Sequence, residues 1–244
     1  MYQFNIRLAD KVISATCEYE TTLGFCKDYI TDDKAEIFVS VSHEELLIEQ
    51  QKERREREIE GVEAKAPSLA YLETLALYRK IAEALVSFGI ILFHGSALSI
   101  DGEVYLFTAK SGTGKSTHTR LWREVYGDRV IMVNDDKPLI KIGSDGVTVY
   151  GTPWNGKHRL GANIKAPLKA ICILERASEN AIKKEDALRV FPEILGQTYR
   201  FSNVIGMQKT LSLVDTLLRR VNVYRLGCNM DPEAAVVSYE GMKG

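Results

Sequence analysis

One stretch of eight residues restricts the fold of this chain more than any other. It reads Ala109-Lys110-Ser111-Gly112-Thr113-Gly114-Lys115-Ser116 and fits the relaxed form of the phosphate-binding loop, with Ala in place of the first Gly. We expect a buried strand before it, over residues 104–107, and a helix after it, over residues 117–126. This strand–loop–helix order is the context that such a loop requires, so the stretch predicts an α/β fold that binds a nucleotide.

The residue types within the stretch suit an anion. Gly112 and Gly114 let the backbone fold so that several N–H groups point at one phosphate, and the N-terminus of the following helix adds unpaired donors and partial positive charge. Lys115 is expected to reach the outer phosphates, and the Ser116 hydroxyl to complete a magnesium shell. The predicted nucleotide-binding residues are Ser111, Gly112, Thr113, Gly114, Lys115, Ser116 and Thr117.

A hairpin is predicted immediately before the loop. Asp101-Gly102 separates two strand-like runs, over residues 90–100 and 103–107, and an Asp-Gly pair in this position is a strong hairpin signal. Counting back from this turn places His94 opposite Ala109, at the start of the loop. His94 is then either a titratable imidazole beside the phosphates or a core histidine bonded to the backbone.

A pair of acidic residues, Asp135-Asp136, follows a strand expected over residues 129–133. Carboxylates just past the end of a buried strand are where the second metal-handling motif of such folds belongs. One carboxylate could hold Mg²⁺, directly or through water, while the other accepts the proton of an attacking hydroxyl. A plain Asp-Asp turn is the alternative.

The segment over residues 151–159 contains Trp154 and three cationisable side chains in a row, those of Lys157, His158 and Arg159. It is either a substrate loop that supplies Lys157 or Arg159 to the transferring phosphate, or a surface loop anchored by Trp154.

Composition excludes several classes of protein. The 244 residues include 32 basic and 33 acidic side chains, which provides no basic field for nucleic acid or a membrane surface. The four cysteines are scattered and form no C-x-x-C pair, so buried free thiols are expected rather than a zinc site or disulfides. No signal segment and no membrane-length apolar run occurs, and a cytoplasmic protein is expected.

Two domains are predicted. Residues 1–67 combine β-rich sequence with a charged helix over residues 43–61, which is either solvated or an arm that binds a partner. Residues 68–244 begin with an apolar helical stripe over residues 68–88 and contain every motif described above. They are therefore expected to form the catalytic domain.

Taken together, His94, the hairpin, the Ser-Gly-Thr-Gly-Lys-Ser loop and the strand ending in Asp135-Asp136 resemble the catalytic domain of bacterial HPr kinase/phosphorylase and its relatives. These proteins share a fold with the ATP-dependent phosphoenolpyruvate carboxykinases. The closer likeness is to short HPr-kinase-like proteins found beside peptide-modification genes, some of which phosphorylate a serine of a precursor peptide. The resemblance implies a phosphoenolpyruvate carboxykinase-type P-loop kinase core, with a twisted mixed sheet flanked by helices, in residues 68–244.

The resemblance also implies roles for individual residues, with ATP and Mg²⁺ as cofactors. His94 corresponds to the family's active-site histidine, Lys115 to its phosphate-binding lysine and Asp135 to the carboxylate that takes the serine proton. Ser116 and Asp136 would hold the metal. A homo-oligomer is compatible with the family. No counterpart of the family's later metal-binding glutamate occurs over residues 151–167, and the arginine loop of the reverse reaction is not recognisable. The resemblance therefore does not extend to phosphorylase activity or to HPr as the substrate.

The predicted function is ATP- and Mg²⁺-dependent phosphoryl transfer to a serine-type hydroxyl of a peptide or small protein. Two alternatives stay open: a small-molecule kinase, and a nucleotide-gated binding or regulatory module without transfer. The intact Asp135-Asp136 pair disfavours the module, because a pure binder needs no acceptor base.

Overall fold

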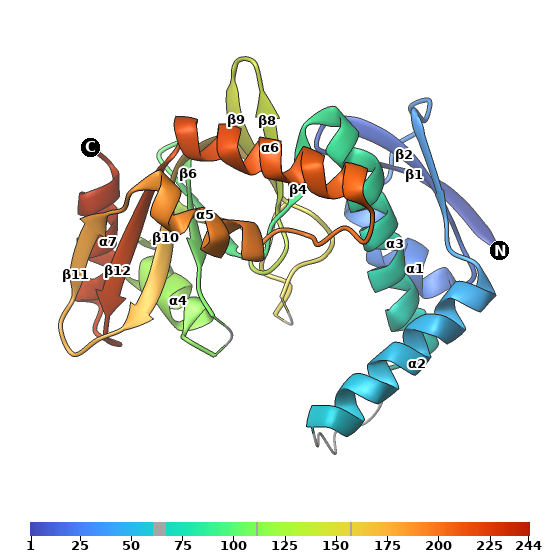
Figure 1. Cartoon of the computed structure of the whole chain (residues 1–244), viewed down its shortest axis with the longest axis horizontal. Coiled ribbons are helices and arrows are strands. Elements are labelled where there is room, and N and C mark those ends of the chain that lie inside the picture. Colours follow the sequence, from blue (N-terminus) through green and yellow to red (C-terminus); the bar gives the residue numbers. More distant parts are fainter. Residues whose placement is uncertain (61–66, 111, 157) are drawn as a thin grey trace. The chain divides into compact units, whose positions relative to one another are not determined.

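The computed structural model describes residues 1–60, 67–110, 112–156 and 158–244, apart from the side chains of residues 52 and 56–60. The protein is of the mixed α/β class and divides into two compact units, Met1–Ala84 and Leu85–Gly244 (Figure 1). The expected Ser111 and Lys157 sites lie outside the described residues. In the part that is described, no helix is both long and apolar enough to cross a membrane.

The first unit contains a three-stranded sheet of order β1-β2-β3, in which β1 and β2 are antiparallel and β2 and β3 are parallel. Its elements are β1 (Tyr2–Leu8), β2 (Lys11–Cys17), α1 (Glu20–Phe25), η1 (Lys27–Tyr29), β3 (Ile37–Ser40), α2 (His43–Glu60) and α3 (Leu69–Leu85). The predicted β-rich sequence and charged helix of this region are confirmed. Helix α3 falls in this unit, whereas the apolar stripe over residues 68–88 is predicted to begin the second domain. The domain boundary between residues 67 and 68 stays a prediction.

The second unit is built on a nine-stranded mixed sheet. Its elements are η2 (Val86–Phe88), β4 (Ile90–Leu92), β5 (Ser96–Ile100), β6 (Glu103–Thr108), α4 (Lys115–Tyr126), η3 (Gly127–Arg129), β7 (Val130–Asn134), β8 (Leu139–Gly143), β9 (Gly146–Tyr150), β10 (Lys165–Arg176), β11 (Ala181–Lys184), α5 (Ala187–Gly196), α6 (Val204–Arg220), β12 (Asn222–Cys228) and α7 (Glu233–Met242).

Strand β10 joins the two parts of this sheet. Its first residues, Lys165 to Pro167, pair with β9, which belongs to the antiparallel set β4-β8-β9. Its later residues pair in parallel with both β6 and β12. One long strand thus pairs with three others, first with β9 and then with both β6 and β12, and the sheet is curled.

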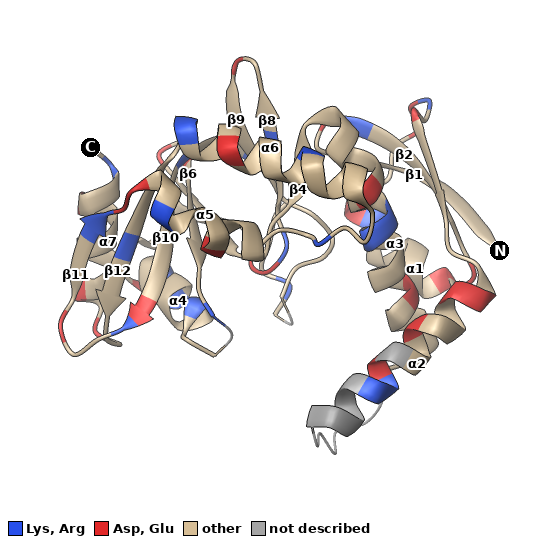
Figure 2. Ribbon diagram, in the orientation of Figure 1, with Lys and Arg blue, Asp and Glu red and all other residues tan. Residues whose placement is uncertain are grey.

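Helices cover both faces of the sheet because the buried strands are apolar on both sides. In β6, Val104 and Leu106 belong to the core that includes α5 and α6. Tyr105 and Phe107, which alternate with them, belong to the core that includes α4 and α7. Lys and Arg are interspersed with Asp and Glu over the described part of both units (Figure 2), in keeping with the near-zero net charge.

The hairpin before the loop is confirmed, with Ile100 opposite Glu103 and with Asp101 and Gly102 at φ values of 53° and 83°, as a tight hairpin turn requires. The expected strand over residues 90–100 is wrong in its extent. It is two strands, β4 and β5, which pair with different neighbours. The ladder between β5 and β6 starts at Ser96 and Phe107, so His94 is not paired with Ala109 in it.

The sequence between Arg176 and Val221 indicates helices, and strand β11 within it was not predicted. It has four residues, no fully buried side chain and no alternating apolar pattern. It pairs with β12 at the edge of the sheet, and this pairing with a distant segment has no local sequence signal.

Candidate active site

The sheet topology brings three separate parts of the sequence to one edge. Strands β6 and β7 both pair antiparallel with β5, so they run in the same direction and their carboxyl ends lie beside the start of β5. The loop over residues 109–114 follows β6, Asp135-Asp136 follows β7, and His94 lies just before β5. The convergence of these segments therefore follows from strand pairing.

The loop after β6 ends at the N-terminus of α4. Gly112 and Gly114 have φ values of 76° and 124°, which residues other than glycine rarely adopt. No side chain of the described residues caps α4, so the N–H groups of its first turn are open to an anion. At the end of β10, the Arg176 guanidinium donates to the carbonyl oxygens of Gly112 at 2.5 Å and Thr113 at 3.3 Å. These two hydrogen bonds keep both carbonyl groups directed towards Arg176.

Lys115, the first residue of α4, is half-buried and lies close enough to both carboxylates to interact with them electrostatically. Burial lowers the pKa of Lys115, and the negative charges of Asp136 and Asp135 act against that decrease. The ammonium group is thus a poorly hydrated cation that faces two acids.

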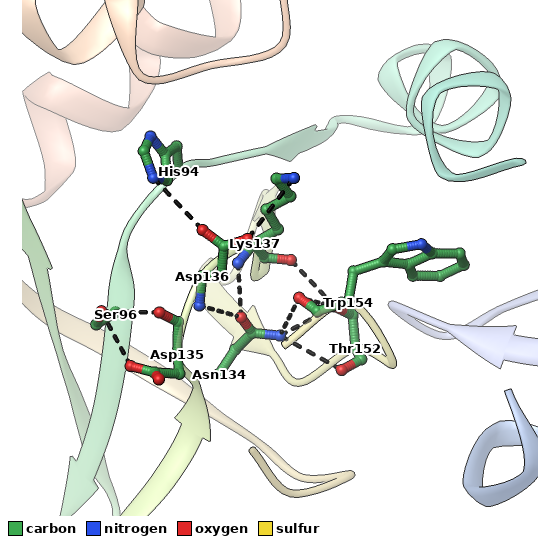
Figure 3. A network of polar contacts seen from close by, with 8 residues as sticks. All are labelled: His94, Ser96, Asn134, Asp135, Asp136, Lys137, Thr152 and Trp154. Atoms are coloured by element: carbon green, nitrogen blue, oxygen red, sulfur yellow. Dashed lines mark hydrogen bonds and ion pairs between the residues drawn. The ribbon is translucent and has the colours of Figure 1, made fainter. Parts of the chain in front are cut away.

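Asp136 lies between two cationisable groups. The Nε2 atom of His94 is 3.4 Å from Oδ1 of Asp136, and the Nζ atom of Lys137 is 3.6 Å from Oδ2 (Figure 3). Burial, and secondly the charge of Lys115, lower the pKa of His94, while Asp136 acts in the opposite direction. Since this pKa lies below the ordinary value of 6.5, the imidazole is neutral at neutral pH.

Asp135 is 8% exposed. The Ser96 hydroxyl donates to the backbone oxygen of Asp135 at 3.0 Å and contacts its Oδ1 at 3.4 Å. Burial, and to a smaller extent the charge of Asp136, raise the pKa of Asp135, while the Ser96 hydroxyl and the positive charge of Arg123 act against that increase. A carboxylate with an elevated proton affinity is suited to accept a proton.

Asn134, which is fully buried, fixes the turn that carries both acids. Its Oδ1 accepts the N–H groups of Asp136 at 2.9 Å and Lys137 at 2.7 Å. Its Nδ2 donates to Oγ1 of Thr152 at 2.9 Å and to the carbonyl oxygen of Trp154 at 3.3 Å (Figure 3). The side chain of Asn134 therefore ties the acidic turn to the segment after β9.

The segment after β9 is anchored by Trp154, which is 3% exposed. Gly156 packs so closely on the acidic turn that a Cβ atom there would lie 2.9 Å from Oδ2 of Asp135. Arg159 is exposed, with a φ of 48°. Within the described part of this segment, the cationisable side chain that lines the cavity beside Asp135 is that of His158.

Two cavities adjoin the start of α4, and Thr117 lines both. The first, which we call the loop cavity, has a volume of about 530 Å³ and is lined by Gly112, Gly114, His118, Arg176 and Asn229, among others. The second, which we call the Asp135 cavity, has a volume of about 510 Å³ and is lined by Ser116, Thr119, Arg120, Arg123, Asp135 and His158, among others.

The site offers a hydroxyl and carboxylates as oxygen ligands, but the described residues contain no group of three or more His, Cys, Asp or Glu that could hold a metal ion. Magnesium commonly binds through one or two carboxylates and completes its shell with water and substrate phosphates. Of the two acids, Asp135 lines a cavity together with Ser116, whereas Asp136 contacts His94 and Lys137. The pairing of Ser116 with Asp136 around a metal ion therefore stays a prediction.

Sequence reasoning missed several residues of this site. Ser96 and Arg176 act through contacts with segments far along the chain, and nothing in their local sequence marks them. Asn134 did have a local signal, because an Asn side chain commonly accepts the backbone N–H group two residues further on, as it does here from Asp136. Arg123 did have a signal: it lies seven residues after Ser116 in a predicted helix, which puts both side chains on one face.

No protein-family model matches the chain, and no curated protein matches it significantly. Among solved structures, the Hpr(Ser) kinase/phosphatase from Coxiella burnetii is similar, at 12% sequence identity and a TM-score of 0.34, over 63% of this chain and 99% of that protein. This is a distant structural resemblance to an HPr kinase/phosphatase.

Proposed function

We propose that this protein is a phosphotransferase of the HPr-kinase-like type, which transfers the γ-phosphoryl group of ATP to a serine-type hydroxyl of a peptide or small protein. The observation that carries the proposal is the convergence, at one sheet edge, of a glycine loop leading into a helix N-terminus, the half-buried Lys115 and the buried carboxylate Asp135.

The nucleotide end of the site is supported by backbone conformation. Gly112 and Gly114 occupy left-handed conformations in front of an uncapped helix, an arrangement that binds phosphates through N–H donors. The loop cavity lies on the side where Arg176 and Asn229 supply polar groups, and its volume is sufficient for a nucleoside. When bound, ATP with Mg²⁺ would supply the phosphoryl group and the charge neutralisation that its transfer needs.

The chain's own residues divide the remaining work. The Ser116 hydroxyl and the Asp136 carboxylate would hold Mg²⁺, and Lys115 would bind the outer phosphates. Neutral His94 positions Asp136 through its Nε2 contact. Lys157 and Arg159 stay candidates for contacts with the transferring phosphate.

Asp135 acts as the general base. As the acceptor oxygen bonds to the γ-phosphorus and the bond to the ADP oxygen breaks, the proton of the acceptor hydroxyl passes to the Asp135 carboxylate. The contact with Ser96 fixes the orientation of that carboxylate. A module that only binds nucleotide would have no use for a buried base held in this way, so transfer is favoured over binding alone.

The test is phosphorylation with γ-labelled ATP, Mg²⁺ and the peptides and small proteins encoded beside this protein, with Asp135→Asn as control. Label on a serine of one acceptor, absent with the variant, is the expected result. Tight ATP binding without label on any candidate would contradict the proposal and favour the nucleotide-gated module or a small-molecule acceptor.

A further inference from the structure

One face of α4 points into the Asp135 cavity. Ser116, Arg120 and Arg123 line this cavity, and their spacing of four and then three residues places them on a single stripe of the helix. Ser116 and Arg123 are about 10 Å apart along the helix axis, at about 1.5 Å per residue. The stripe therefore extends from Ser116, at the expected phosphate end of the site, to Arg123. The distance between them is roughly the length of one small acceptor molecule or of one amino-acid residue of a peptide acceptor.

The lining of the Asp135 cavity contains more cationisable side chains than carboxylates. Arg120 and Arg123 carry full positive charges, and His158 adds a third cationisable group, against the one carboxylate of Asp135. Arg120 has a partner in Glu124, with Nη1 and Oε1 2.5 Å apart.

Arg123 differs from Arg120 in its hydrogen bonding. Its Nε atom is buried and has no hydrogen-bond partner among the described residues. Buried guanidinium donors without acceptors are uncommon in folded proteins, because the desolvated donor loses its water and gains nothing. An acceptor oxygen that enters the cavity would satisfy it.

Asp135 does not satisfy this nitrogen. The positive charge of Arg123 acts on Asp135, but the hydroxyl contact of that carboxylate is with Ser96. If Asp135 takes the proton of the acceptor hydroxyl, the part of the acceptor next to that hydroxyl lies towards Arg123. A negatively charged group there would meet Arg123 and Arg120 together.

We propose that the Asp135 cavity is an acceptor subsite that binds a carboxylate group of the acceptor, held by Arg123 and Arg120 beside the hydroxyl that is phosphorylated. This inference rests on the proposed phosphotransferase function and restricts its substrate class. Guanidinium groups bind carboxylates through paired, charge-assisted hydrogen bonds. The carboxylate can come from an acidic side chain next to the serine of a peptide, or from a small hydroxy acid.

The kinetic test uses acceptors in matched pairs, with ADP release as the readout. Serine peptides carry Glu or Gln beside the serine, and 3-hydroxybutyrate and glycerate are paired with their amides. The carboxylate member of the preferred class should show a kcat/KM about tenfold to a hundredfold higher than its amide partner. The peptide and hydroxy-acid arms separate the two sources of the carboxylate.

Arg123→Gln should remove most of that preference, and Arg123→Lys should keep part of it. Arg219→Gln, which removes an exposed cation of α6 paired with Asp215, should leave the preference unchanged. Equal kcat/KM values for the members of every pair in the unmodified protein would overturn the subsite, and so would an equal loss on both members in Arg123→Gln with normal circular dichroism.

If no acceptor is phosphorylated, that result counts against the proposed function and not against the subsite. The subsite is then tested by a binding measurement. The Nε–H resonance of Arg123, assigned with Arg123→Lys, is followed by NMR in the full chain during titration with 3-hydroxybutyrate, its amide, and the Glu and Gln peptides. A shift with a carboxylate member and not with its amide supports the subsite. No shift with any of them overturns it.

Discussion

The Nε2 atom of His94 lies 3.4 Å from Oδ1 of Asp136, and Lys115 acts on both residues electrostatically. Because burial and Lys115 together outweigh Asp136, the pKa of His94 should lie below 6.5. Lys115→Met should raise this pKa, and Asp136→Asn should lower it further, since each removes one of the opposing charges. Titration of the imidazole resonances by NMR measures both changes without any ligand.

The same shift predicts the sign of a stability effect. Between the depressed pKa of His94 and 6.5, its ordinary value, the unfolded chain binds more protons than the folded chain. The free energy of unfolding should therefore decrease as pH falls through this window. His94→Gln should reduce that decrease in urea unfolding series. The charge arrangement would be contradicted if His94→Gln left the pH dependence of the free energy of unfolding unchanged. It would also be contradicted if Lys115→Met and Asp136→Asn shifted the pKa of His94 in the same direction.

Replacement of Lys115 by Ala should abolish phosphoryl transfer and weaken ATP binding. The side chain begins α4 directly after the glycine loop and is half-buried beside two acids, so no other described cation of the loop is placed equivalently. A loss of kcat of at least about a hundredfold is expected for a charge that stabilises the transferring group. Lys110→Ala, which removes an exposed lysine of the same loop, is the matched control. Tight ATP binding by Lys115→Ala in calorimetry would refute the assignment.

Asp135→Asn should spare ATP binding while reducing transfer by about a hundredfold to ten-thousandfold, the usual contribution of a general base.

Asp135→Asn should also stabilise the fold at neutral pH. The pKa of Asp135 is raised above 3.8, so the folded chain binds more protons than the unfolded chain just above that pH, and stability is lost as pH rises through the folded pKa. The variant lacks this loss. Full turnover, or a melting temperature below that of the unmodified protein at pH 7, would contradict these roles.

Local sequence was sufficient for the elements that surround this site but not for their contacts. The Asp101-Gly102 turn determined the register of β5 on β6, because hairpin pairing is set by neighbouring residues. The loop glycines and the Asp135-Asp136 pair were visible as motifs, and their spatial convergence is a property of the structure. His94 could not be placed by counting along the hairpin, since the chain leaves the ladder before Ser96 and its backbone N–H bonds to Gln197 at 2.7 Å.

The contacts of Asp135 were hidden for a similar reason. Its partners come from β5, from α4 and from the segment after β9, which are far apart in the chain. Only the assembled sheet brings them together. Trp154 is buried and anchors its segment, and a substrate contact from Lys157 or Arg159 of that segment stays a prediction.

Gly156→Ala should reduce activity through Asp135, although residue 156 has no reactive group. The added Cβ would lie 2.9 Å from Oδ2 of Asp135, closer than carbon and oxygen normally approach, so the carboxylate or the segment must move. A fall in kcat of about tenfold to a hundredfold, with ATP affinity unchanged, is expected from displacement of a catalytic group. Gly196→Ala, at the end of α5 where a Cβ would meet nothing within 4 Å, is the control and should have normal kcat. Equal activity of the two variants would show that Gly156 does not constrain Asp135.

Asn134→Ala should destabilise the second unit by about 2 to 4 kcal/mol, because it removes a fully buried side chain and leaves the part-buried N–H groups of Asp136 and Lys137 without their acceptor. Thr152→Val removes a weaker part of the same network, the hydroxyl that accepts from Asn134 at 2.9 Å and donates to the Lys137 carbonyl at 3.0 Å, and should cost about 1 to 2 kcal/mol. Urea unfolding followed by tryptophan fluorescence measures both, with Thr216→Ala on the exposed face of α6 as control. Because the two side chains share a hydrogen bond, the double variant should lose less than the two single losses combined. Strict additivity would mean that Asn134 and Thr152 act independently, and the acidic turn would then be held by something other than this network.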